Sequence, residues 1–522
     1  MMTLRYPISG GDFDSAGLAT RKLKEHLARI GVAGPVLRRA MIASYEAEMN
    51  VVIHARTGTL WARLDDASLD LEIADEGPGI PDVGLALREG WSTASSQARQ
   101  MGFGAGMGLP NIQRNSDQFE IETRVGRGTR IRSTIRLRQQ EESSVVRAEE
   151  AVCPTIAAER CHRCMRCIFA CPMGALRIGS QGPTIRASQC VGCAACIAEC
   201  TAGVFGLPAT KATPRDFRDV VLIAPRGYLS GLADGSSFQR VSGAIRCLGF
   251  GAVRLAEEWE AAQLSAARAR TGTSPKPLIP ASCSAVVALV ESRFPSLIPH
   301  LGPWLPPIEA AGEEFPLKSV APLAACPSQY AALRKQSLTE RLSVLTPAFL
   351  TDAVRRVHAS PPESAMPLPQ SGEPERGPGE LFVTGTRHVL RALSAAEAGA
   401  LADVSLLHLS LCEGGCSGSP LLCPDAQLAN RFLSAPARDG ETEKAGVVAR
   451  SRPYAQRTGM RLDPDMAVAI RKLAAIDELT KGLPGRDCGA CGAPGCAAFA
   501  EDVVMGRARE SDCPHAMREG SV

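Results

Sequence analysis

Two runs of cysteines with the same spacing constrain the fold of this chain more than any other feature. The first run follows the pattern C-x2-C-x2-C-x3-C at Cys161, Cys164, Cys167 and Cys171. The second run repeats the pattern at Cys190, Cys193, Cys196 and Cys200. Three thiolates at such short intervals can wrap one corner of an iron–sulfur cube, whereas the fourth is too constrained to join them and binds the neighbouring cube. The spacing therefore predicts two [4Fe–4S] clusters that exchange their fourth ligands.

This exchange assigns one ligand set to each cluster. The first set is Cys161, Cys164, Cys167 and Cys200, and the second is Cys190, Cys193, Cys196 and Cys171. Zinc is the alternative metal, because C-x2-C pairs also build tetrahedral zinc sites. Zinc, however, needs two pairs of ligands rather than three plus one. Pro172 ends the first run in the bacterial ferredoxin manner, and residues 155–205 resemble a dicluster ferredoxin domain.

Composition narrows the class of protein further. A chain of 522 residues is long enough for about three or four domains. The 58 basic and 55 acidic side chains leave a formal charge of +3, and 4% of residues are aromatic, so nucleic acid is not an expected partner. No apolar run is long enough to span a membrane, and Met1–Asp14 lacks the apolar core of an export signal. We therefore expect a cytoplasmic protein, whose 19 cysteines indicate metal rather than disulfides.

The N-terminal region shows a different pattern. Apolar spacing predicts helices over residues 16–30 and Val36–Ala55, and the second helix carries Glu46 and Asn50 on one face. Alternating apolar residues predict strands over Leu60–Leu64 and Leu69–Ala74. An Asp-x-Gly-x-Gly turn then begins at residue 75, a glycine-rich run covers 102–109, and a Gly-x-Gly-Thr segment covers 126–129. The glycines fit neither the Rossmann pattern nor a P-loop.

The order of these segments resembles that of the GHKL ATPase superfamily, and most closely its small switch-type serine kinases and anti-sigma factors. The resemblance covers residues 1–138 and implies an α/β sandwich that binds Mg–ATP. By position it implies that Glu46 is the general base and that Asn50 holds Mg²⁺. It further implies that the nucleotide is contacted by Asp75, Gly77, Gly79, Gly104, Gly106, Gly108 and Thr129. The alternative is a decayed fold that binds no nucleotide.

The last predicted strand of this region carries a row of arginines. Arg130, Arg132, Arg136 and Arg138 alternate with apolar residues, so they share one face of the strand. A solvated sheet face explains the row, and docking of an acidic partner is the alternative.

Four further cysteines are scattered through residues 206–435. They are Cys283, Cys326, Cys412 and Cys416. Their surroundings resemble the catalytic region of [FeFe]-hydrogenases, which implies an α/β region with a cubane held by these four thiolates. Two positions depart from that family: Ser282 replaces a proton-relaying cysteine, and Gln329 replaces a lysine. The region is also short, with a proline-rich stretch near 361–378, so we expect a hydrogenase-derived domain without hydrogen chemistry.

A last group of cysteines lies near the C-terminal end, at Cys488, Cys491, Cys496 and Cys513. Residues 475–522 resemble the small [4Fe–4S] module of electron-transfer subunits, and zinc is again the alternative. Residues 139–154 and 436–474 are expected to be linkers. Cys153, Cys247 and Cys423 fit no group and are expected to be small hydrophobes.

Two functions are compatible with these motifs. The first is an iron–sulfur redox sensor or electron relay with an ATP-binding domain, which in one form phosphorylates a serine of a partner-switching protein. The second is a hydrogenase-like or electron-bifurcating subunit that works with other electron-transfer subunits. The loss of the relay cysteine and the lysine favours the first.

Overall fold

The computed structural model describes residues 1–94, 106–137, 153–210, 217–233, 238–315, 319–336, 343–357, 377–422 and 445–516. Gly104, Arg138, Cys423 and most of the proline-rich stretch lie outside these ranges. The chain divides into two compact units. The first comprises Met1–Arg147, Ala455–Arg486 and Cys496–Val522, and the second comprises Ala148–Tyr454 and Asp487–Gly495. None of the helices in the described ranges combines the length and apolar character that a membrane crossing requires.

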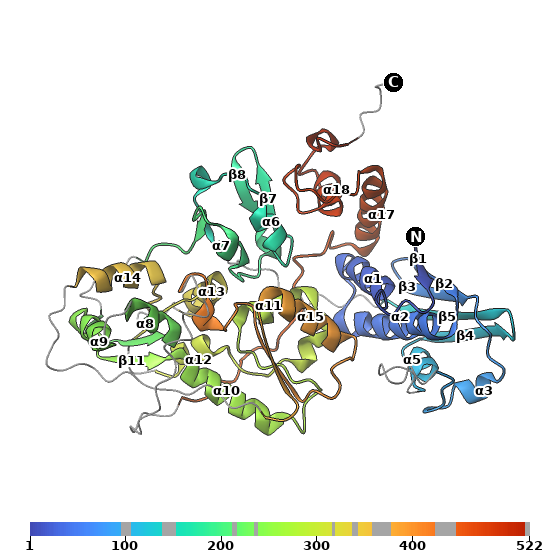
Figure 1. Ribbon diagram of the computed structural model, residues 1–522, viewed down its shortest axis with the longest axis horizontal. Coiled ribbons are helices and arrows are strands. Elements are labelled where there is room, and N and C mark those ends of the chain that lie inside the picture. The colour runs from blue at the N-terminus through green and yellow to red at the C-terminus, as the bar shows by residue number, and fades with distance from the viewer. Residues whose placement is uncertain are drawn as a thin grey trace. The chain divides into compact units, whose positions relative to one another are not determined.

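The first unit is built on a five-stranded antiparallel sheet with the order β1-β2-β3-β5-β4. The strands are β1 (Met2–Ser9), β2 (Thr57–Leu64), β3 (Ser68–Asp75), β4 (Gln118–Arg124) and β5 (Gly128–Arg136). Its N-terminal helices are α1 (Leu18–Arg29), α2 (Gly34–His54), α3 (Val83–Ala86) and α5 (Gly108–Arg114). Helices α1 and α2 lie along the sheet in Figure 1. The fold thus has the α/β sandwich form expected from the sequence, with predicted helix and strand ends shifted by a few residues.

Strand β1 was not predicted, although its side chains alternate strictly between buried and exposed. Pro7 lies within this strand, and proline usually argues against a central strand. Here the strand pairs only with β2 and forms the edge of the sheet, where a missing backbone donor is tolerated.

The arginines of β5 lie on the polar face of this sheet, where glutamates of neighbouring strands pair with them. Arg132 contacts Glu72 at 3.2 Å and Glu122 at 2.9 Å, and Arg130 contacts Glu72 at 3.6 Å. These side chains are partly exposed, so each pair contributes little to stability. Arg130 and Arg132 therefore lie on a solvated sheet face and are paired with its glutamates.

Helix α1 begins without a capping side chain of its own, because Gly17 stands at its N-cap. Glu48 of α2 supplies the acceptors instead: its Oε1 accepts from the Ala19 N–H at 3.1 Å, and its Oε2 accepts from the Thr20 N–H at 2.9 Å and the Thr20 hydroxyl at 2.7 Å. Glu48 is 2% exposed. A buried carboxylate on the N-terminal N–H groups also suits the helix dipole, so Glu48 ties α1 to α2.

The first unit also contains helices from the C-terminal part of the chain. They are α17 (Met466–Gly482), α18 (Cys496–Val504) and the short η7 (Glu510–Asp512). Asp465 caps α17 by accepting from the Val468 N–H at 2.9 Å. Helix α17 therefore runs across residue 474, where we expected a linker to end, and the described residues 455–465 belong to the same compact unit.

The second unit begins with two related halves that carry the cysteine runs. Their strands and helices are β6 (Thr155–Ile156), η2 (Ala158–Arg160), α6 (Arg166–Ala170), β7 (Leu176–Gly179), β8 (Gly182–Ile185), η3 (Ala187–Gln189), α7 (Ala195–Glu199) and β9 (Phe205–Gly206). Strand β6 pairs with β9 and β7 with β8. Met165 and Ala194, which stand at the same place in the two runs, both have a left-handed backbone with φ of 64° and 63°. Such turns cost about 1–3 kcal/mol each outside glycine.

The rest of the second unit is an α/β region, as the sequence predicted. A three-stranded parallel sheet has the order β11-β10-β12, and two further strands, β13 and β14, also pair in parallel. The strands are β10 (Val221–Ala224), β11 (Ala252–Leu255), β12 (Val320–Pro322), β13 (Glu380–Thr384) and β14 (Leu406–Ser410). All four residues of β10 are buried, as expected for a central parallel strand.

Helices surround these two sheets. They are α8 (Arg226–Ala233), α9 (Phe238–Cys247), α10 (Ala256–Arg270), α11 (Ser284–Arg293), η5 (Pro295–His300), α12 (Pro307–Glu313), α13 (Pro327–Gln336), α14 (Pro347–Arg356), α15 (Thr386–Glu397) and η6 (Cys416–Gly418).

The contact between Glu48 and α1 gives a first prediction. Glu48→Gln preserves the shape of the side chain but replaces one acceptor oxygen with an amide that faces an N–H group. Hydrogen bonds to charged groups contribute about 1.5–3 kcal/mol, so hydrogen exchange in the amides of α1 should accelerate about tenfold or more. Hydrogen–deuterium exchange of the full chain measures this. Glu120→Gln, whose side chain is 70% exposed, is the control, and unchanged exchange in α1 would contradict the role of Glu48.

Candidate functional site

The predicted base and metal ligand of the N-terminal domain lie together on helix α2. Glu46 and Asn50 are four residues apart, so helical periodicity places them on one face. A Cβ atom added to Gly108, at the start of α5, would lie 3.2 Å from Asn50 Oδ1 and 3.4 Å from Glu46 Oε2. The glycine therefore allows α5 to approach both side chains closely, and a larger residue would crowd them.

Asn111 is a further residue of this site that sequence reasoning missed. Its Nδ2 donates to Glu46 Oε1 at 2.6 Å, and its Oδ1 accepts from Arg114 at 2.9 Å. Arg114 also pairs with Glu89 at 2.7 Å. The signal in the sequence was the position of Asn111, one turn after Gly108 on the same helix. Asn111 thus fixes the carboxylate of Glu46 from one side.

Asp75 ends strand β3 and organises the first glycine turn. Its Oδ1 accepts from the Gly77 N–H at 2.8 Å and from the Thr129 N–H at 3.2 Å. Burial raises the pKa of Asp75 above its ordinary value, although these two hydrogen bonds oppose the shift. The turn therefore brings Asp75 and Thr129 side by side.

Two other glycines are required by close backbone contacts. Gly79 has φ of +71°, and a Cβ there would lie 2.3 Å from the Arg124 carbonyl oxygen. Gly106 has φ of +74°, and a Cβ there would lie 2.4 Å from the Gly90 carbonyl carbon.

Helix α2 ends at His54, whose pKa is lowered by burial and raised less strongly by the charge of Asp75. His54 therefore stands at the end of α2, close enough to Asp75 for their charges to interact.

The described donors fit Mg–ATP. Mg²⁺ prefers oxygen ligands such as an amide or carboxylate oxygen, and Asn50 and Glu46 supply both next to a glycine-rich helix start. When bound, the metal would neutralise phosphate charge. The chain's own part is to hold the amide oxygen of Asn50 and the carboxylate of Glu46 at one place, with Asn111 fixing the latter.

Cysteines of the two runs lie near one another in the structure. Burial, and then the charges of Cys200, Cys161 and Cys164, raise the pKa of Cys167 to about 11. Cys196 lies within reach of the charges of Cys193, Cys190 and Cys171, which add to burial in raising its pKa. Cys200 of the second run therefore lies near Cys167, and Cys171 of the first run lies near Cys196.

The thiol groups of the two runs are the kind of donors that a cubane requires. Among the described residues, no three His, Cys, Asp or Glu side chains converge on the position of one ion, and none of the described cysteines forms a disulfide. In a cubane each thiolate binds a different iron, so the sulfurs surround the cluster instead of one point. Backbone N–H groups of Arg163, Ala175 and Val204 donate to the sulfurs of Cys161, Cys171 and Cys200 at 3.3–3.4 Å. Such bonds tune cluster potentials.

Cys153 lies next to the second cysteine run, although the sequence predicted no contact with either run. It forms a side-chain hydrogen bond with Cys190, which lowers the pKa of Cys153. Cys153 therefore makes a polar contact that the prediction of a small hydrophobic residue did not include.

The four scattered cysteines also gather at one place in the second unit. Burial raises the pKa of Cys416 well above its ordinary value, and the charges of Cys283, Glu260, Cys326 and Cys412 add to the shift. Burial raises the pKa of Cys326 to about 12, with a contribution from Cys193 of the second run. The Ser328 N–H donates to the Gly192 carbonyl at 3.2 Å. The second cysteine run and this gathered set are therefore direct neighbours.

The two residues that depart from the hydrogenase pattern are held by hydrogen bonds beside these cysteines. Ser282 donates its hydroxyl to Gln263 Oε1 at 2.9 Å, and Gln263 donates to the Leu305 carbonyl at 3.0 Å. Gln329 Nε2 donates to Cys416 Sγ at 3.4 Å. Neither Ser282 nor its partner Gln263 ionises near neutral pH.

The C-terminal cysteines fall in different parts of the structure. Cys488 and Cys491 belong to the second unit, and Cys496 and Cys513 belong to the first. In the second unit, the Ile178 N–H donates to the Gly492 carbonyl at 2.9 Å. In the first unit, Cys496 begins α18, and the side chain of Phe499 is 2% exposed.

Three family models match separate parts of the chain. Residues 38–139 match "Histidine kinase-, DNA gyrase B-, and HSP90-like ATPase", residues 160–204 match "4Fe-4S dicluster domain", and residues 483–515 match a model for an Fe-S cluster.

Two bacterial proteins are similar to the N-terminal domain. Serine/threonine-protein kinase RsbT of Bacillus subtilis is 29% identical over 121 residues, which are 22% of this chain and 85% of that kinase. Anti-sigma F factor of Caldanaerobacter subterraneus is 35% identical over 94 residues, which are 17% of this chain and 62% of that factor. The chain thus covers less than two thirds of the anti-sigma factor.

Solved structures of [FeFe]-hydrogenase HydA1 from Chlamydomonas reinhardtii also resemble part of the chain. One variant has 12% identity and a TM-score of 0.34, and covers 42% of this chain and 84% of the hydrogenase. This score is too low to establish a shared fold. The family models and relatives make the chain a multidomain protein that joins a GHKL-type ATPase domain, similar to anti-sigma F factors and the RsbT kinase, to a 4Fe-4S dicluster domain and a further Fe–S module.

Proposed function

We propose that this protein is an iron–sulfur electron relay or redox sensor whose N-terminal domain binds Mg–ATP and reports the redox state to a partner protein. The observation that carries the proposal is the contact between the second cysteine run and the gathered cysteines, through Ser328 and Gly192. Clusters held at these two places would be close enough to exchange electrons. The chain would thus carry electrons between these clusters. It would not transfer protons at Ser282, because a serine hydroxyl does not ionise near neutral pH.

The N-terminal domain would convert this state into a phosphorylation signal or a binding signal. Glu46 would accept the proton of an attacking hydroxyl, and Asn50, whose side chain also lies near Gly108, would hold the metal ion. The RsbT relative is named as a serine/threonine kinase. A serine hydroxyl of a partner protein is therefore the proposed phosphoryl acceptor, and a cytoplasmic partner-switching protein is the proposed kind of partner.

The role of Asn50 and Asp75 gives a prediction for nucleotide binding. Asn50→Ala should remove the dependence of ATP binding on Mg²⁺. The resemblance implies that Asp75 accepts a hydrogen bond from the adenine amino group. Asp75→Asn retains an oxygen that can accept from Gly77 and Thr129. It replaces the other oxygen with a donor, so it should reduce the preference for adenine over guanine. A hydrogen bond to a charged group contributes about 1.5–3 kcal/mol, or roughly 10- to 100-fold in affinity.

Isothermal titration of the full chain with ATP and GTP, with and without Mg²⁺, measures both effects. Glu120→Gln on the polar sheet face is the control. Absence of heat with the unmodified protein for both ATP and ADP would refute the proposed nucleotide function.

The cysteine groups predict the iron content. Four loaded cubanes give about 16 irons per chain, and the dicluster domain alone gives about 8. Cys283→Ser should lower the iron and sulfide content by one cluster and leave the dicluster spectrum in electron paramagnetic resonance unchanged, since that variant touches neither run.

Cys488→Ser should likewise remove one cluster. Cys247→Ser is the matched control, because Cys247 is exposed and belongs to no group. Two equivalents of zinc in place of iron in anaerobically purified protein would favour the alternative metal.

Because serine and glutamine stand at positions 282 and 329, we expect that the protein neither produces nor consumes H2 at enzymatic rates. A general acid must ionise near the working pH to deliver a proton, and the Ser282–Gln263 pair does not. Hydrogen production from reduced methyl viologen, after maturation with the full set of hydrogenase assembly factors, measures this. Rates well above buffer that disappear in Cys416→Ser would instead support the hydrogenase alternative.

A further inference from the structure

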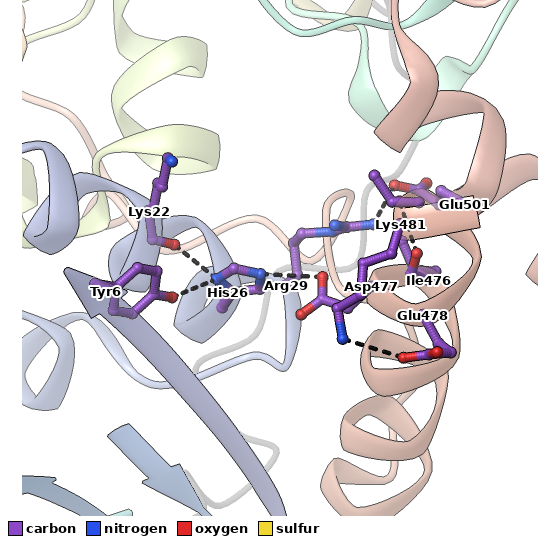
Figure 2. A network of polar contacts seen from close by, with 10 residues as sticks. Tyr6, Lys22, His26, Arg29, Ile476, Asp477, Glu478, Lys481 and Glu501 are labelled. Carbon is purple, nitrogen blue, oxygen red and sulfur yellow. Dashed lines mark hydrogen bonds and ion pairs between the residues drawn. The ribbon is translucent and has the colours of Figure 1, made fainter. Parts of the chain in front are cut away.

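Helix α1 of the ATPase domain is paired with the C-terminal helices of the same compact unit. Figure 2 shows His26 and Arg29 of α1 facing Asp477 of α17 and Glu501 of α18. His26 Nε2 lies 3.3 Å from Asp477 Oδ1, and its Nδ1 lies 3.0 Å from the Tyr6 hydroxyl of β1. Arg29 lies 2.8 Å from Glu501 Oε2. The basic side of this surface thus comes from α1 and the acidic side from the C-terminal segment.

The Arg29–Glu501 pair is largely sheltered from water. The two side chains are 17% and 15% exposed, whereas the pair Lys481–Glu478 on the outer side of α17 is 74% and 79% exposed. Glu501 also faces Arg507 of its own segment at 3.8 Å. Breaking a sheltered pair leaves a poorly solvated charge behind, so Arg29–Glu501 matters more to docking than an exposed pair does.

The chain before α17 encloses the C-terminal end of α1. The Leu462 N–H donates to the Arg29 carbonyl at 2.9 Å. Arg461 lies against Gly31, where a Cβ would be 2.5 Å from its Nε. Leu462 is buried. The last turn of α1 is therefore held by backbone and side-chain contacts as well as by charge.

The other end of α1 is tied to the nucleotide site. The N–H groups of Ala19 and Thr20 bond the buried carboxylate of Glu48. Glu48 stands on α2 midway between Glu46 and Asn50 in the sequence. A displacement of α1 must therefore pull on the turn of α2 that carries the proposed base and the proposed metal ligand.

We propose that the C-terminal segment, residues 455–486 together with α18, is a built-in partner of the ATPase domain that acts on its nucleotide site through α1. The docked segment fixes α1, and Glu48 passes that constraint to Glu46 and Asn50. Helix α18 begins at Cys496, so a change at that cysteine reaches Arg29 through Glu501, five residues further along the helix. The inference rests on the proposed binding of Mg–ATP by this domain.

Thermodynamic linkage makes the coupling reciprocal. If docking prepares α2 for the nucleotide, then nucleotide binding must stabilise docking by the same factor. Typical couplings between two sites are about 5- to 150-fold. Release of the segment should weaken nucleotide binding, because part of the binding free energy must then be used to order α2.

The test uses charge reversals in the full chain. Arg29→Glu and Glu501→Arg should each accelerate amide exchange over α17 and α18 and weaken the affinity for Mg–ATP about fivefold or more. The double variant Arg29→Glu/Glu501→Arg restores the pair with opposite polarity and should recover both properties. Lys481→Glu is the control on the same helix and should alter neither. Added Mg–ATP should slow exchange in α17 of the unmodified protein.

Each contrary result has a distinct meaning. Faster exchange over α17 with unchanged affinity in both single variants would overturn the coupling while leaving nucleotide binding intact. Unchanged exchange in both single variants would also overturn it, because the pairs would then not hold the segment. Lack of Mg–ATP binding by the unmodified protein would instead refute the proposed function together with this inference.

Discussion

Mutual burial of thiol groups is the constraint on which the second unit depends. Burial raises the pKa of Cys193 and Cys326 to about 12, and the charges of other cysteines add to the shift for both. Bare thiolates at these places would repel one another in a poorly solvated environment. Metal cations bound among the sulfurs make the electrostatic energy favourable, because a bound metal deprotonates the thiols and attracts the resulting thiolates. Metal binding and folding of this unit are therefore expected to be one process.

The left-handed turns at Met165 and Ala194 belong to the same constraint. Each turn lies between the second and third cysteines of a run and begins the helix that carries the third. Neither residue is glycine, so the turn has an energetic cost that the surroundings must offset. Ligation of the flanking cysteines by one cluster is a direct way to do so. The two turns occupy the same position in their runs, so both halves use the same backbone conformation between the second and third cysteines.

Local sequence patterns predicted much of this architecture. Spacing alone placed Cys171 with the second run and Cys200 with the first, because short covalent intervals limit which sulfurs can share a cluster. Helical periodicity placed Glu46 and Asn50 on one face of α2, and the structure gives Glu48 a capping role on α1. Asn111 escaped prediction because its partner Glu46 is 65 residues away. The contacts of α1 with α17 and α18 escaped for the same reason, since no local pattern encodes a pairing of side chains that distant segments supply. The boundaries of the other domains and the residues of the sites remain predictions.

The separation in sequence between the two parts of the first unit has a consequence for biosynthesis. The N-terminal part ends at Arg147 and the next part begins at Ala455, a difference of 455 − 147 = 308 positions. At about 5–20 residues per second on the ribosome, roughly 15–60 s pass between them. Throughout that interval the nascent ATPase domain has His26 and Arg29 without their acidic partners, while the cysteine runs of the second unit have already emerged. A chain whose synthesis stops in this interval would therefore have an N-terminal domain whose His26 and Arg29 lack Asp477 and Glu501.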